Sequence, residues 1–336
     1  MKTASLNHRL YYLVLLFFGI TFNPGVLAAQ HDLPGRRIIC KSDIDLWMIQ
    51  LSNWGRWRKE DQLGALNLVS AARARAATHL VKAGVSISLA HQAVTERAVD
   101  NPLPFVHRMD KSGIDSDSGA SDTYSVTYHG LVQTHMDALC HFFYQGKMFN
   151  GFAKEEVTGS GARKLGIEKL KNGIMARGVL MDIPRLKQVQ YLEPGAAIFP
   201  SDLEAWEQAA RVKIRAGDVV LIRTGRWERR AAKGPWEPNK VAGLDASCAP
   251  WLKKRDIAIL GSDACSDVVP SGVEGVEMPI HQLMLGAMGV VILDNCDLEA
   301  LGEAANNRQK WEFLLTVAPL VVVGGTGSPV NPIATF

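Results

Sequence analysis

The sequence is poor in cysteine, in net charge and in long apolar segments, and each shortage excludes a class of protein. Its five cysteines include no C-x-x-C pair, so neither a zinc knuckle nor a thioredoxin-like redox site is indicated. With 37 basic and 34 acidic side chains, the chain gives no electrostatic reason to expect a nucleic-acid partner. We expect most cysteines to be buried small apolar residues, although an oxidising compartment would permit one disulfide.

The N-terminus carries a short apolar run that follows basic residues. Lys2 and Arg9 precede the apolar residues 10–22, and the small-residue ending V-x-A follows at Ala28. This order is typical of a secretory signal peptide. A retained anchor is the less favoured alternative, because a helix of that length spans ~20 Å of a ~30 Å hydrocarbon core. We therefore expect residues 1–28 to be a cleaved signal peptide. The mature protein would be periplasmic or secreted, with no stable membrane span.

The rest of the chain predicts one α/β domain, residues 76–336, preceded by an N-terminal arm, residues 29–75. No internal repeat or linker suggests a further division. In the arm, Trp47, Trp54 and Trp57 either pack the segment on the body or form an aromatic wall for a substrate. A helix is expected after Ser70 as N-cap and before Gly84.

Continuous apolar runs bounded by turn signals predict strands that are covered on both faces. These runs are residues 177–184, 217–225, 256–263, 289–295 and 319–325. Alternating stretches predict two further strands at 85–91 and 123–130, and the segment 99–122 between them predicts a long loop. Helical patterns fall between the later runs, the first with Ser201 as N-cap. We therefore expect a single domain of mixed β-sheet flanked by helices.

A short polar cluster, "THMDALCHFF", stands out in a chain with only nine histidines. On a strand, His135 and Asp137 point to one face with Cβ atoms ~7 Å apart, so one cation can contact both. His141 reaches the same pocket if the chain turns. An imidazole next to a carboxylate suits zinc or manganese.

The segment "THMDALCHFFYQGKMFNG" resembles the signature T-H-x-D-x-x-x-H of the cyclase family, which includes bacterial kynurenine formamidases and isatin hydrolases. Further segments resemble the family in the same order: "NWGRW", "GDVVLIRTG", "LGSDACSDVVP", "MPIHQLMLGAMGVVILDNCDLEAL" and "GGTGSPVNPIA". The resemblance runs from about residue 50 to the C-terminus and is strongest to longer members that read "DALCH". It implies a swivelling β/β/α-like fold.

The resemblance also implies a set of site residues. His135 and Asp137 would bind metal, His141 would be the acid/base residue, and His281 would be a downstream ligand. Asp294 matches the last ligand, although the family commonly has glutamate there and the spacing here is one residue longer. The implied cofactor is a divalent metal, Mn²⁺ or Zn²⁺.

One family ligand is missing. The formamidase pattern H-x-x-x-H-x-D places a histidine where this chain has Leu131. His129 would lie ~20 Å from His135 on a straight strand, so a bulge would be needed to bring it in. Gln133 is nearer and offers a carbonyl oxygen. We expect one ion, held by His135, Asp137 and His281, with Asp294 or Gln133 as the remaining ligand.

Structural roles compete with these assignments. His281 could cap the helix that it opens, and Asp263, Asp267 and Asp294 could each form a turn. The segment "GGTGSP" lacks the lysine and helix of a P-loop, which excludes nucleotide binding on this motif. "SPVNP" is interpreted as a rigid loop near the pocket.

The favoured function is a metal-dependent hydrolase that cleaves an amide, lactam or related C–N bond of a small, aromatic substrate. The alternatives are a metal-dependent cyclase or dehydratase, and a non-catalytic exported ligand-binding protein, which the leucine at position 131 would suit. The expected partner is a small-molecule substrate, and we expect a homo-oligomer.

Overall fold

The computed structural model describes residues 38–336, and Ile39–Phe336 forms one compact unit. The signal peptide expected at residues 1–28 therefore lies outside the described residues. Among the helices from residue 38 onward, none is both long and apolar enough to span a bilayer. The thiols of Cys140, Cys265 and Cys296 are free and buried, as expected of small apolar residues, whereas that of Cys40 is free and exposed.

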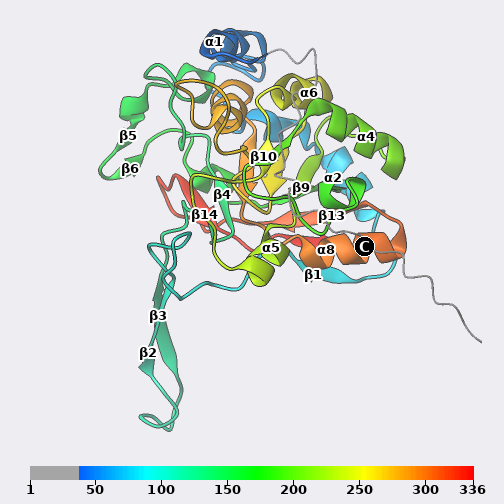
Figure 1. Ribbon diagram of the computed structural model, residues 1–336. Coiled ribbons are helices and arrows are strands. Elements are labelled where there is room, and N and C mark those ends of the chain that lie inside the picture. The colour runs from blue at the N-terminus through cyan, green and yellow to red at the C-terminus, as the bar shows by residue number, and fades with distance from the viewer. Residues whose placement is uncertain (1–37) are drawn as a thin grey trace, which may run out of the picture. The chain divides into compact units, whose positions relative to one another are not determined.

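A nine-stranded mixed sheet forms the centre of this unit (Figure 1). Its order is β1 (Ser86–Ser88), β15 (Ile333–Thr335), β13 (Glu312–Val317), β7 (Ile174–Asp182), β9 (Val219–Arg223), β11 (Ile259–Ser262), β12 (Val291–Asp294), β4 (His135–Asp137) and β14 (Gly327–Pro329). Strands β7, β9, β11 and β12 run parallel, and the outer pairs are antiparallel. Every residue of β9, β11 and β12 is buried, which explains their continuous apolar sequences.

Helices and short sheets surround the central sheet (Figure 1). The α-helices are α1 (Lys41–Gln50), α2 (Ala71–Thr78), α3 (Ile183–Leu186), α4 (Pro200–Ala210), α5 (Arg226–Lys233), α6 (Cys248–Arg255), α7 (Pro279–His281) and α8 (Glu299–Arg308). Four 3₁₀ segments are η1 (Gly64–Leu68), η2 (Phe149–Gly151), η3 (Lys154–Glu156) and η4 (Ile167–Leu170), and η5 (Gln282–Met288) is a π-helix. The two-stranded sheets are β2 with β3 (Val106–Lys111, Ser121–Ser125), β5 with β6 (Val157–Thr158, Gly161–Ala162) and β8 with β10 (Ala197–Ile198, Gly243–Leu244). The predicted fold class, a mixed sheet flanked by helices, is confirmed.

One predicted strand is wrong. Residues 319–325 form no strand, and Val323 is 81% exposed. The strand lies one segment earlier, at β13, which pairs with β7. Buried and half-buried residues alternate along β13, and this pattern is a weaker sequence signal than a continuous apolar run.

Two helix boundaries differ from the prediction. Ser70 is the N-cap of α2, as expected, and its Oγ accepts a bond from the Arg73 amide, but the helix ends at Thr78, well before Gly84. Helix α4 begins at Pro200, so the N-cap is Phe199 rather than Ser201. Proline suits the first helical position because its missing N–H has no partner there anyway.

The segment expected to be a long loop is a β-hairpin. Strands β2 and β3 pair with each other and project from the body of the unit (Figure 1), and every residue in them is exposed. Strand β3 ends at Ser125, so residues 126–134 reach the central sheet without regular structure. The extended strand that we expected over 123–130 is therefore wrong beyond Ser125.

The tryptophan-rich segment packs on the π-helix η5. Asn53 Nδ2 donates to the Met288 carbonyl at 2.8 Å, and Trp54 Nε1 donates to the Gly286 carbonyl at 2.8 Å. Trp47 and Trp57 pack against the main hydrophobic core. None of the three tryptophans lies among the residues that line the large cavity described below, so packing is the role that the structure gives them.

Candidate functional site

Strand β4 carries two of the predicted ligands at the centre of the site. His135 and Asp137 lie on one face of the strand, with His135 Nε2 3.4 Å from Asp137 Oδ1. The antiparallel register between β12 and β4 pairs Asp294 with His135. The offset of one residue that we noted in the sequence therefore does not keep Asp294 away from the site. His135 and Asp137 are 3% and 1% exposed, which is rare for such polar groups without a partner.

His281 joins this group from the end of helix α7. Its Nε2 lies 3.1 Å from Asp294 Oδ2 and 3.6 Å from Asp137 Oδ2. The π-helix η5 begins at the next residue, and such irregular turns occur often at functional sites. The structure thus brings together all four side chains predicted to bind metal, from two distant parts of the chain.

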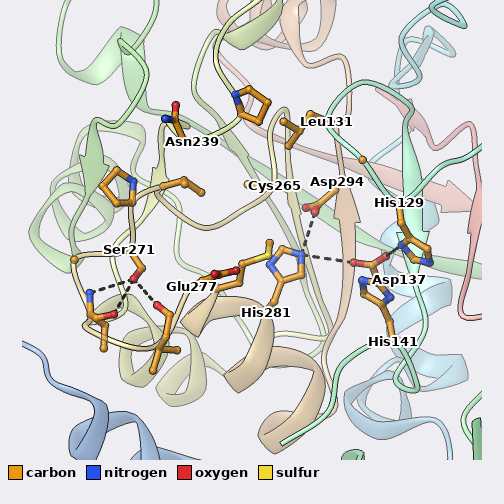
Figure 2. Close-up of a pocket in the computed structure, with 18 of the residues that line it drawn as sticks. His129, Leu131, Asp137, His141, Asn239, Cys265, Ser271, Glu277, His281 and Asp294 are labelled. Carbon is orange, nitrogen blue, oxygen red and sulfur yellow. Dashed lines mark hydrogen bonds and ion pairs between the residues drawn. The ribbon is translucent and has the colours of Figure 1, made fainter. Parts of the chain in front are cut away.

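His129 is the main correction to the sequence analysis. Its Nδ1 lies 3.0 Å from Asp137 Oδ1, and its ring centroid is 5.3 Å from that of His135 (Figure 2). The expected distance of ~20 Å assumed a straight strand, but residues 126–134 do not form one. The chain folds back here and supplies a histidine although position 131 is leucine.

The loop that follows β13 holds the His129 ring. Thr326 Oγ1 lies 3.0 Å from His129 Nε2. A Cβ atom at Gly327 would lie 3.0 Å from His129 Cε1 and 2.6 Å from the Met136 carbonyl oxygen, so only glycine leaves room for the ring. The "GGTGSP" segment, which we excluded as a P-loop, thus positions a candidate ligand.

His141 stacks on His129. Their ring centroids are 3.9 Å apart and the planes differ by 2°. Burial lowers the pKa of His141 to about 4, with a smaller opposing effect from the Asp137 charge. The side chain is therefore neutral at pH 7 and has a lone pair that can accept a proton.

Ligand-type atoms form two overlapping groups in the described residues. The first is His129, Asp137 and His141, and the second is His135, Asp137 and Asp294; within each, the atoms lie within 4.8 Å of one another. Asp137 belongs to both, and in Figure 2 it lies between His281 and the pair His129 and His141. A carboxylate shared by two groups is an arrangement that can bridge two ions.

Hydrogen bonds behind the site fix which nitrogen of each histidine faces inward. The Nδ1 of His135 lies 2.8 Å from the Gln133 carbonyl oxygen, and the Nδ1 of His281 lies 2.6 Å from Asp267 Oδ2. Because a carbonyl and a carboxylate can only accept, both Nδ1 atoms are donors, and Nε2 is the nitrogen of each ring that faces Asp137. Outer partners of this kind commonly orient metal-binding imidazoles.

The structure also decides the roles of three further residues that the sequence left open. Asp267 also accepts the amides of Ile280 and His281 at 2.7 and 3.1 Å, so it is more than a turn residue. The Gln133 side chain donates to the Val94 carbonyl at 3.2 Å and does not line the cavity, so its proposed role as a ligand is wrong. Asp263 accepts the amides of Thr224, Gly225 and Arg226 at the start of α5, so its side chain holds a distant segment and not the local turn that we considered for it.

The donors of the site fit a divalent cation. Asp137 Oδ1 and His129 Nδ1 are buried and, despite their 3.0 Å approach, have no hydrogen-bond partner. Burial opposes ionisation of Asp137, but the charge of His135 and the close approach of His129 and His281 hold the pKa of this carboxyl well below its usual range. An ionised carboxylate with imidazole lone pairs around it matches the mixed nitrogen and oxygen ligands of zinc or manganese.

These groups lie at one wall of a cavity of about 1250 Å³. The other lining residues include Leu131, Val273 and Val276, together with Glu274 and Glu277. No lysine or arginine is among the lining residues in the described part of the chain. The cavity is thus large enough for a small aromatic molecule and carries only acidic and neutral side chains beside the histidines.

Comparison with known proteins identifies relatives of this chain. The profile of a family described as "Putative cyclase" matches residues 78–267. The crystal structure of a novel cyclase is 32% identical, with a TM-score of 0.78, and the alignment covers 86% of this chain and 99% of that one. No curated protein matches this chain significantly.

Two more distant structures show the same fold. Isatin hydrolase A from Ralstonia solanacearum is 21% identical, with a TM-score of 0.52 over 79% of this chain and 95% of that one. An isatin hydrolase bound to the product analogue thioisatinate is 19% identical, with a TM-score of 0.54 over 79% and 98%.

Proposed function

Because this chain belongs to the cyclase family, we propose that it is a metal-dependent hydrolase that cleaves an amide, lactam or related C–N bond of a small aromatic substrate. The observation that carries this proposal is the pair of ligand groups that share Asp137 at the wall of the cavity. The fold is also that of an isatin hydrolase solved with a product analogue, which supports an arylformamidase-like or isatin-hydrolase-like reaction.

Mn²⁺ or Zn²⁺, held by His135, Asp137, His281 and Asp294, would polarise the substrate carbonyl and make water more acidic. His129 is a further ligand candidate that the sequence pattern did not identify, and with it the side chains present suffice for two ions. The leucine at position 131 is therefore no reason to favour a non-catalytic binding protein, since His129 occupies the place beside Asp137.

His141 is the proposed acid/base residue. It is neutral at pH 7 and lies next to His129 at the cavity wall. In this role it accepts a proton from the attacking water and delivers it to the leaving nitrogen, a contribution of typically ~10²–10⁴ in rate. The apolar lining residues, Val273 and Val276 among them, would hold the aromatic part of the substrate.

Charge around the cavity narrows the substrate class. Glu274 and Glu277 line it, no ion pair to either is present in the described residues, and no basic side chain lines the cavity. An anionic substrate would lack a counter-charge on the protein. We therefore propose a neutral or cationic aromatic amide or lactam.

The proposal is tested by metal analysis of the purified protein, followed by a screen of formanilides, isatin-like lactams and lactones in ¹⁸O-labelled water. Hydrolysis incorporates one labelled oxygen into the carboxylate product. Turnover without label would favour a cyclase or dehydratase instead. Tight binding of an aromatic amide by metal-loaded protein without any turnover would favour a binding protein.

We also propose that the protein is exported and assembles as a homo-oligomer. The N-terminal sequence motif carries the first proposal, and the projecting, fully exposed hairpin of β2 and β3 is compatible with the second, because an isolated two-stranded hairpin is only marginally stable in water. Export is tested by mass spectrometry of the mature protein, which should lack residues 1–28. The number of subunits is measured by light scattering in solution.

A further inference from the structure

Asn295 follows the candidate ligand Asp294 and bonds to the segment that precedes β4. Its φ of 54° is left-handed, a conformation that asparagine adopts more readily than most residues. The side chain is fully buried. Its Nδ2 donates to the carbonyls of Gly130 and Gln133 at 2.7 and 3.3 Å. It therefore ties the end of β12 to the irregular segment that carries His129 and leads into His135.

These bonds reach the ligands in one further step. The Gln133 carbonyl that accepts from Asn295 also accepts from Nδ1 of His135, at 2.8 Å. Gly130 is the residue next to His129. In addition, Thr134 Oγ1 donates to the Asn295 carbonyl at 2.7 Å. A displacement of Asn295 would therefore shift both halves of the metal centre.

A buried arginine holds the Asn295 amide in place. Arg226 Nη1 donates to Asn295 Oδ1 at 2.5 Å. The guanidinium lies over two tryptophan rings, 4.9 Å from the centroid of Trp227 and 4.7 Å from that of Trp236. A cation over an aromatic face gains electrostatic energy, most of all when water is excluded.

The burial of Arg226 is costly for the fold. The residue is 0% exposed, and neither Nε nor Nη2 has a hydrogen-bond partner. No carboxylate forms an ion pair with it among the described residues; the nearby Asp100 pairs with Arg230 instead. A buried cation with unsatisfied donors destabilises a protein, and replacement by an apolar side chain is often neutral or stabilising. Stability alone therefore gives no reason for arginine at this position.

We propose that Arg226 and Asn295 form a clamp that positions the metal ligands: Arg226 orients the Asn295 amide, and Asn295 sets where His129 and His135 lie relative to Asp294. Neither side chain lines the cavity, so both are positioning residues. The inference rests on the proposed metal-dependent function.

The test measures metal binding and coordination rather than activity alone. The purified mature protein is freed of metal with a chelator and titrated with Co²⁺, whose visible absorption reports ligand geometry. The variants are Arg226→Met and Asn295→Asp. Arg226→Met removes the charge at similar bulk, and Asn295→Asp keeps the acceptor for Arg226 but replaces the donor to the two carbonyls. A third variant, Arg226→Lys, retains a donor and should partly restore binding.

We expect Co²⁺ affinity to fall about 10–100-fold in the first two variants, as for other outer partners of metal ligands, with an altered absorption spectrum. Thermal unfolding of metal-free Arg226→Met should not occur at a lower temperature than in the parent. The matched control is Arg255→Met, because Arg255 also lies over a tryptophan, 3.4 Å from the Trp251 centroid, but pairs with Glu207 away from the site. This control should lower stability and leave the spectrum unchanged.

The remaining outcomes would refute either the clamp or the proposed metal site. Affinity and spectrum equal to those of the parent in both Arg226→Met and Asn295→Asp would refute the clamp and leave the proposed function intact. A parent protein that binds no Co²⁺ would refute the proposed metal site and the clamp with it. If Arg226→Met fails to fold, its role is structural and the clamp is refuted for Arg226, while Asn295→Gly, which keeps the left-handed backbone, decides the role of Asn295 by the same titration.

Discussion

Nδ1 of His129 lies 3.0 Å from Oδ1 of Asp137, and neither atom has a hydrogen-bond partner. Two buried polar atoms in this position destabilise the fold unless a third group satisfies both. A cation does so, because it accepts a lone pair from each. This pair therefore links the irregular segment before β4 to the chemistry proposed for the site.

Replacement of His129 should weaken metal binding although the family pattern has its histidine at position 131. We expect His129→Ala to bind Zn²⁺ or Mn²⁺ at least ~10-fold more weakly than the parent protein. Loss of a residue that only orients a metal ligand already lowers affinity ~10–100-fold. Calorimetric titration of the metal-free protein measures this. The control is His79→Ala, an exposed histidine outside the site. Unchanged affinity in His129→Ala would show that His129 is not a metal ligand.

His141→Ala should separate proton transfer from metal binding. If His141 is the acid/base residue, the variant keeps its metal and loses ~10²–10⁴ in turnover. Metal content and kcat are measured on the same preparation. His141 also belongs to a ligand group with His129 and Asp137, so it could bind metal instead. In that case His141→Ala would lose its metal, and excess metal would restore its activity.

Substrate charge should affect binding through the acidic cavity wall. Formanilide should be hydrolysed with a higher kcat/KM than its para-carboxylate, since Glu274 and Glu277 repel the added charge and no basic residue offsets it. The double variant Glu274→Gln and Glu277→Gln should narrow the difference, mainly through KM. Low salt should enlarge the effect because these residues are exposed. A preference for the carboxylate in the parent protein would contradict the proposed substrate class.

Acid should destabilise the protein in part through Glu207. Burial raises the pKa of this carboxyl, but Arg255, the Ile214 amide and Lys213 together lower it to about 2. A depressed folded-state pKa contributes stability that is fully present above the unfolded value of ~4.3 and is lost as pH falls towards 2. A shift of about two units corresponds to ~3 kcal/mol at most.

Urea unfolding from pH 6 to pH 2 measures this contribution. Glu207→Gln should be less stable than the parent at pH 6, because Arg255 and the Ile214 amide lose a charged acceptor, and its stability should fall less steeply below pH 5. The control, Glu303→Gln, changes an exposed acid on α8 and should follow the parent curve. Parallel curves for the parent and Glu207→Gln would show that other carboxylates dominate acid unfolding.

The sequence alone determined the elements whose signal is local. Continuous apolar runs marked β7, β9, β11 and β12, since strands covered on both faces need apolar side chains throughout. The period-two spacing of His135 and Asp137 placed both on one face of β4. The order of motifs along the chain indicated the family.

Only the tertiary structure decided what depends on contacts between distant residues. His129 could not be assigned because its ring is held by contacts with Thr326 and Gly327, far along the chain, and these contacts are not visible in the local sequence. Asp267 looked like a turn residue and Asn295 had no predicted role. Their hydrogen bonds to His281 and to Gly130 exist only once α7 and β12 pack beside β4. Side-chain spacing is set by the backbone over a few residues, whereas a metal centre is completed by hydrogen bonds and packing between segments that the sequence does not bring together.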